Sequence, residues 1–162
     1  MSKILFLFGL LFLTQTCDNV TANKLNDIEG EWILQKVFLS DAYDSPCGWE
    51  AGDHESITLN ISSEGGKFSF NGNSAVNSYF GSFEVFSFDS ESNNGTLKVG
   101  PIGSTKKAGP GPLMNCESRY FSYLETAGDI GLFEEDELRI GNFKTPDSHP
   151  RDRGTYLIFE RR

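Results

Sequence analysis

The chain of 162 residues is acidic, with 23 Asp and Glu against 14 Lys and Arg and a net charge of −9. Such a charge repels polyphosphates, so we do not expect a nucleic-acid partner. With 38% hydrophobic residues the chain can bury one ordinary core and is too short for two comfortable domains. Its 14 Phe and 17 Gly favour an antiparallel β architecture, because aromatic side chains fit pleated surfaces and glycine marks turns.

The N-terminus has the pattern of a secretory signal peptide. Lys3 precedes the apolar run from Ile4 to Leu13, which is too short to cross a bilayer. Cys17 follows T-Q-T and resembles the lipidated cysteine of bacterial lipoproteins. We therefore predict a signal peptide over 1–16, a lipid anchor on Cys17 and an N-terminal tether over 17–27. The alternative is cleavage after Ala22, which would remove Cys17 and release a soluble protein.

The cysteine count agrees with export. If Cys17 is lipidated or removed, Cys47 and Cys116 remain as one pair in an oxidising compartment. We expect a disulfide between them that tethers a long loop to a helix. The alternative is two unpaired thiols, with Cys116 serving as a small core residue.

Most of the chain after residue 28 predicts short strands. One begins near Trp32, and 56–61 alternates and turns through S-S-E-G-G into 67–70, which indicates a hairpin. Residues 79–88 carry aromatic side chains on both faces, which predicts a central strand covered on both sides. The segment 89–95 resembles half of a calcium loop but lacks its final acid, so we expect a hairpin turn. Further strands are expected over 96–102, 130–133, 138–143 and 155–161.

One stretch, from Pro112 to Gly128, has a sustained helical period. Pro112 suits the first helical turn, and Gly128 suits a left-handed residue just past the end. Glu117 lies within the apolar face, where a carboxylate needs a partner. At about 100° per residue, the apolar residues that share this face are Leu113, Cys116, Tyr120, Tyr123, Leu124 and Ala127.

Three segments occur in the order found in the META-domain family of HslJ-like bacterial heat-shock lipoproteins. I-E-G-E-W-I-L resembles the family's L-x-G-x-W-x-L, and F-S-F-N-G-N-S-A-V-N-S-Y-F-G-S-F resembles its G-x-x-G-C-N-x-Y-x-G-x-Y. I-G-S-T-K-K-A-G-P-G-P-L-M-N-C-E-S-R-Y-F-S-Y-L is similar to I-x-x-T-x-M-A-C followed by M-x-x-E-x-x-F-x-x-L. The resemblance implies a mostly β (α+β) domain over 28–162. Its fold would be a strongly curled antiparallel sheet or partial barrel of about eight strands, with one helix packed across it.

The family's usual cysteines fall at Val76 and Gly109 here, so its common pair is missing. The polar and glycine positions that match the family are Asn77, Tyr79, Gly81, Thr105 and Glu117.

Two interpretations of these positions remain open. In the structural one, the Asn77 side chain satisfies a tight turn, Gly81 allows a backbone bend, and Glu117 accepts hydrogen bonds from backbone N–H groups near Thr105. In the functional one, a small polar cleft at the start of the helix binds a ligand or peptide. The residues expected to line that cleft are Asn77, Tyr79, Thr105, Lys106 and Glu117.

The sequence offers no catalytic constellation. It contains no G-x-S-x-G, H-E-x-x-H, C-x-x-C or glycine-rich phosphate loop, and His54 and His149 lie in polar turns. The resemblance supplies no catalytic residues either, so we expect a protein without enzymatic activity, cofactor or metal.

The resemblance implies a protein of the cell envelope with a role in stress or antibiotic tolerance. We expect a monomer, lipid-anchored in the outer membrane or periplasm or otherwise secreted, that interacts with another envelope protein. The alternative is a lipocalin-like carrier of a small apolar ligand, because G-E-W also opens that barrel. Lipocalins complete eight strands before their helix, whereas the helix expected here precedes the last three strands.

Overall fold

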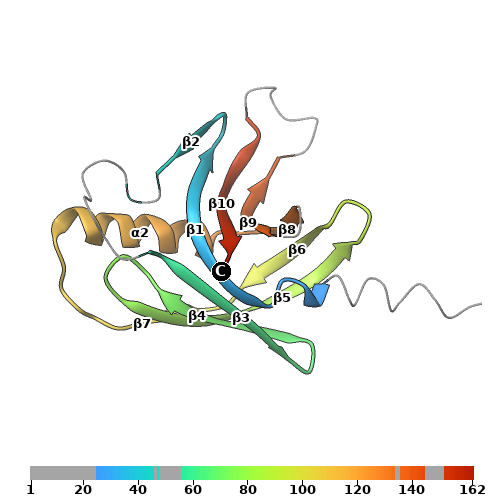
Figure 1. The fold of residues 1–162 in the computed structure, drawn as a ribbon, viewed down its shortest axis with the longest axis horizontal. Coiled ribbons are helices and arrows are strands. Elements are labelled where there is room, and N and C mark those ends of the chain that lie inside the picture. The colour runs from blue at the N-terminus through green and yellow to red at the C-terminus, as the bar shows by residue number, and fades with distance from the viewer. Residues whose placement is uncertain (1–24, 46, 48–55, 134–135, 145–151) are drawn as a thin grey trace, which may run out of the picture.

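The structure, a computed structural model, describes residues 25–45, 47, 56–133, 136–144 and 152–162. Figure 1 shows a strongly curled sheet, with one helix running into the space between its upper and lower strands. The helix is α2 (Gly111–Glu125). The strands are β1 (Gly30–Leu39), β2 (Ala42–Asp44), β3 (Thr58–Glu64), β4 (Lys67–Asn73), β5 (Ser78–Asp89), β6 (Asn94–Val99), β7 (Gly103–Ser104), β8 (Asp129–Phe133), β9 (Glu137–Phe143) and β10 (Gly154–Arg161).

The sheet closes on itself. Its strand order is β10-β9-β8-β6-β5-β4-β3-β1-β2, and β10 also pairs with β1 in antiparallel register. Eight antiparallel strands therefore form a closed barrel, while β2 and β7 are additions that pair with β1 and β5. This confirms the mostly β fold of about eight strands with one helix, and the barrel is complete rather than partial.

β1 pairs with three neighbours because its pairing changes along its length. Gly30–Ile33 pairs with β3 and Val37–Leu39 pairs with β2, while β10 follows the opposite edge. The register with β10 shifts between Leu34 and Lys36. Such a β-bulge bends a strand and increases its twist. It therefore helps β1 to curve around the barrel.

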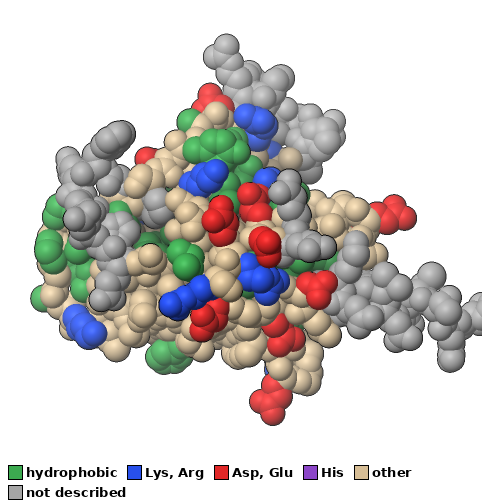
Figure 2. Space-filling view, viewed as in Figure 1, with side chains coloured by type: hydrophobic (Ala, Val, Ile, Leu, Met, Phe, Trp, Pro, Cys, Tyr) green, Lys and Arg blue, Asp and Glu red, His purple; other side chains and the backbone are tan. Residues whose placement is uncertain are grey.

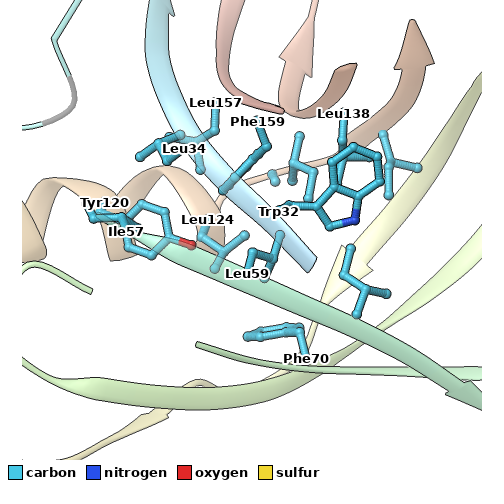
Figure 3. Close-up of a cluster of buried hydrophobic side chains, with 14 of the residues drawn as sticks. Trp32, Leu34, Ile57, Leu59, Phe70, Tyr120, Leu124, Leu138, Leu157 and Phe159 are labelled. Carbon is cyan, nitrogen blue, oxygen red and sulfur yellow. The ribbon is translucent and has the colours of Figure 1, made fainter. Parts of the chain in front are cut away.

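The barrel interior is filled by large side chains. Trp32 and Phe159 are 0% exposed, and the indole nitrogen of Trp32 donates to the Ile28 carbonyl at 2.9 Å. α2 contributes Tyr120 and Leu124 to the same interior, each 2% exposed. Figure 3 shows these side chains converging from the strands and the helix. Because a buried side chain of this size contributes about 1.5–3 kcal/mol, the interior is the main source of stability.

The C-terminus of the helix differs from the prediction. α2 ends at Glu125, and its C-cap is Thr126 with φ −93°, so the expected left-handed Gly128 is wrong. The Thr126 hydroxyl donates to the Ser122 carbonyl at 2.7 Å. The Ser122 carbonyl also accepts from the Thr126 N–H at 3.2 Å, and the Leu124 carbonyl accepts from the Ala127 N–H at 3.2 Å, so a short turn satisfies a terminal carbonyl without a left-handed glycine.

The outer face of β5 also differs from the prediction. Tyr79 and Phe83 face the interior as expected, but Phe80 and Phe86 are each 65% exposed. The expected cover on both faces of this strand is therefore wrong, because a closed barrel buries only the inward side of each strand.

The segment after β5 is a hairpin turn, as predicted. Asp89 accepts hydrogen bonds from the Glu91 N–H at 2.9 Å and the Ser92 hydroxyl at 2.8 Å, and these bonds lower the pKa of Asp89. Within the described ranges, no three His, Cys, Asp or Glu side chains are grouped to hold a metal ion. No helix in the same ranges has the length and apolarity that crossing a bilayer requires.

Candidate functional site

A buried carboxylate joins α2 to the loop between β4 and β5. Glu117 is 5% exposed and faces Ser74 and Asn77, each 3% exposed. One carboxylate oxygen accepts from the backbone N–H groups of Val76 at 3.2 Å and Asn77 at 2.8 Å, and from the Ser74 hydroxyl. The other oxygen accepts from Asn77 Nδ2 at 2.8 Å. Four donors therefore compensate for the removal of this carboxylate from water.

Asn77 extends the network to the segment before α2. Its Oδ1 accepts from the Thr105 hydroxyl at 2.8 Å and from the Lys107 N–H at 2.7 Å. Its Nδ2 also donates to the Lys107 carbonyl at 3.4 Å. Both ends of the Asn77 amide are thus used, and the loop between β4 and β5 is held to α2 and to the segment before it.

The burial of Glu117 was predicted, but its donors were not. The expected backbone donors near Thr105 are wrong, because Val76 and Asn77 supply the N–H groups. Thr105 reaches the network only through Asn77. The prediction that the Asn77 side chain satisfies a tight turn is also wrong, since its partners Thr105, Lys107 and Glu117 lie outside the turn. Within the turn, the Ser74 N–H donates to the Asn77 carbonyl at 2.7 Å.

Gly81 serves close packing rather than the expected bend. The Phe70 ring lies over it, so a Cβ at this position would come within 2.4 Å of Phe70 Cζ. Gly81 pairs with Phe70 across β4 and β5, within a run of unbroken register. The glycine therefore makes room for a core aromatic ring.

A cavity of about 310 Å³ opens beside this network. Of the five residues expected to line a cleft, Asn77 lines it, and Lys106, Thr105, Tyr79 and Glu117 do not. Ser74 was not among the predicted cleft residues, and the lysine that lines the cavity is Lys107 rather than Lys106. The cavity is lined by Asn73, Ser74, Ala75, Val76, Asn77, Ser78, Lys107 and Leu113.

Tyr79 points into the barrel instead. Its hydroxyl lies 2.6 Å from the Tyr120 hydroxyl and donates to the Thr58 carbonyl at 2.7 Å. Burial raises the pKa of Tyr79 well above its usual range and does the same to Tyr120. The paired hydroxyls therefore remain protonated and serve to satisfy polar atoms inside an aromatic core.

The expected disulfide is present between Cys47 and Cys116, whose Cα atoms are 4.6 Å apart. It ties the chain after β2 to the helix position next to Glu117. Arg119 forms a salt bridge with Asp44 at 3.1 Å, so a second contact joins β2 and α2 nearby. Cys17, His54 and His149 lie outside the described residues.

The comparisons with known proteins agree with this architecture. The sequence profile of the META domain matches residues 24–154. A search of curated proteins finds no match. Among solved structures, the NMR structure of a protein from Burkholderia xenovorans is similar, with 21% identity, a TM-score of 0.55 and coverage of 98% of this chain and 99% of that chain. At this identity the likeness supports the fold alone. Because the family match spans most of the chain, the protein belongs to the META domain family.

Proposed function

We propose that this protein is a non-enzymatic, exported protein of the cell envelope that binds another envelope protein through its outer surface and so contributes to stress tolerance. The observation that carries this proposal is the filled barrel. Trp32, Tyr79 and Phe159 occupy the interior at 2% exposure or less. A carrier of the lipocalin type needs that space for its ligand. A barrel filled by its own side chains is better suited to bind a partner protein through its outer surface.

The outer surface offers aromatic anchors for such a partner. The large hydrophobic side chains exposed on the described part of the chain are Tyr43 at 61%, and Phe80 and Phe86 at 65% each. Two of the three lie on the outward face of β5. Aromatic residues are enriched among those that carry binding energy at protein interfaces. Figure 2 shows that one face of the molecule mixes acidic, basic and scattered hydrophobic side chains. We assign the partner contact to Phe80 and Phe86.

Membrane association is part of the same proposal. A lipid on Cys17 would hold the barrel at the envelope through the tether over 17–27, and the META resemblance implies that location. Cleavage after Ala22 would give the same domain without an anchor. The envelope location and the stress role are both inferred from family resemblance.

The test is capture of envelope proteins by chemical cross-linking in the native cells. We expect the wild type to form a discrete cross-linked complex, and the variant Phe80→Ser with Phe86→Ser to lose most of it. Tyr43→Ser, which removes an exposed ring from a different strand, is the matched control and should retain the complex. Complexes of equal yield from the wild type and the Phe80 and Phe86 variant would overturn the assignment of the surface.

A further inference from the structure

The cavity beside the Glu117 network has a wall that is fixed before any ligand binds. Glu117 has four donors, and the Asn77 amide uses both its oxygen and its nitrogen. Neither side chain needs a ligand to satisfy it. The network instead holds the loop between β4 and β5 against the segment that leads into α2 (Figure 1). A preformed wall lowers the entropy cost of binding.

Two exposed residues that line this cavity, Asn73 and Lys107, carry side-chain donors without a partner in the described part of the chain. Among the described residues, the Lys107 ammonium has no hydrogen-bond or salt-bridge partner, and only the Lys107 backbone takes part in the network. Asn73 Oδ1 accepts from the Ser78 hydroxyl at 3.0 Å, which leaves Asn73 Nδ2 without a partner in the same ranges. The two donors suit a negatively charged group that accepts hydrogen bonds.

The rest of the lining is mixed, with Ser74, Asn77 and Ser78 as its polar members. Its apolar members are Ala75, Val76 and Leu113. The cavity volume of about 310 Å³ lies at the small end of ligand sites. That space suits one amino-acid residue or an acid of similar size.

We propose that this cavity binds a carboxylate carried beside a small apolar side chain. The carboxylate contacts Lys107 and Asn73, and the apolar group lies against Val76 and Leu113. The carboxylate has two possible sources, a free small carboxylic acid or the C-terminal residue of a peptide, and capture of a chain end is a known mode of peptide recognition. Neither Phe80 nor Phe86 lines this cavity, so the proposal does not depend on the partner surface proposed above.

The test is a two-dimensional amide NMR titration of the purified protein with N-acetyl-leucine and with its amide, which lacks the charge. We expect saturable shifts at Ala75, Val76 and Asn77 with the acid, and binding of the amide that is at least about tenfold weaker, because a charged hydrogen bond is lost. The tripeptide acetyl-Gly-Gly-Leu with a free C-terminal carboxylate distinguishes a peptide end from a free small acid as the natural ligand. Binding at least as tight as that of N-acetyl-leucine indicates a peptide end, and much weaker binding indicates a free acid.

Two lysine variants test whether the bound carboxylate contacts Lys107. Lys107→Gln should weaken binding of the acid about tenfold and leave the spectrum of the free protein otherwise unchanged, because the network uses only the Lys107 backbone. Lys106→Gln is the matched control, since Lys106 is exposed, adjacent and absent from the lining. The proposal is wrong if neither acid gives saturable shifts, if acid and amide bind equally, or if both lysine variants bind like the wild type.

Discussion

Replacing Glu117 by Ala is expected to lower the free energy of unfolding by about 3–5 kcal/mol. The change leaves buried donors from Ser74, Val76 and Asn77 without an acceptor. Glu117→Gln keeps the shape but replaces one oxygen by an amide group that faces other donors, so we expect a smaller loss of about 1–3 kcal/mol. Urea unfolding with an unchanged m-value gives both numbers.

The matched control for these variants is Glu125→Gln. Glu125 lies on the same helix but is exposed, so its replacement should change stability by no more than about 0.5 kcal/mol. If Glu117→Gln unfolds at the same urea concentration as the wild type, the carboxylate is not the acceptor that the network requires.

The second large effect is expected from the disulfide. Cys47 and Cys116 are 69 residues apart in the sequence. The chain-entropy relation then predicts that replacing both by Ser costs about 4 kcal/mol. For a domain of this size that loss lowers Tm by on the order of 10 °C. Scanning calorimetry of the wild type and the double variant, each with and without a thiol reductant, measures the effect.

Two controls separate the covalent bond from the contacts around it. Reductant should lower the Tm of the wild type to that of the double variant and leave the variant unchanged. Arg119→Gln removes the neighbouring salt bridge to Asp44, whose side chains are 41% and 37% exposed, and should cost less than about 1 kcal/mol. A wild type whose thiols are shown to be reduced but whose Tm does not fall would contradict the prediction.

The fold was predictable because local patterns and family resemblance pointed the same way. The helical period marked the helix around Glu117, and aromatic alternation marked β5. Barrel closure was harder to predict, since the pairing of Trp32 with Arg161 joins residues at opposite ends of the domain. A strand's alternation shows which side chains share a face, but it does not identify the neighbouring strand.

The site was predicted only in outline. The apolar helix face around Glu117 predicts that its carboxylate needs hydrogen-bond donors. The sequence near Glu117 does not indicate that these donors come from a loop 40 residues earlier. Lys106 and Lys107 are adjacent and chemically identical, and they lie in an irregular segment without a period to tell them apart. The exposure of Phe80 was not predicted either. An aromatic residue on a strand is expected in the core, and the sequence does not show which face of the strand points out of the barrel.

The central claim is that the filled barrel holds no ligand and that the protein binds its partner through its outer surface. Its most direct test is titration of methyl-labelled protein with dodecanoate, a simple apolar ligand of the kind that a carrier would hold. Leu59, Leu138 and Leu157 are fully buried in the interior, and their methyl signals report on it. If the barrel is filled by its own side chains, these signals should not move as the ligand is added. A saturable shift of all three, with one ligand bound per chain, would show that the interior opens to a ligand and that the protein is a carrier.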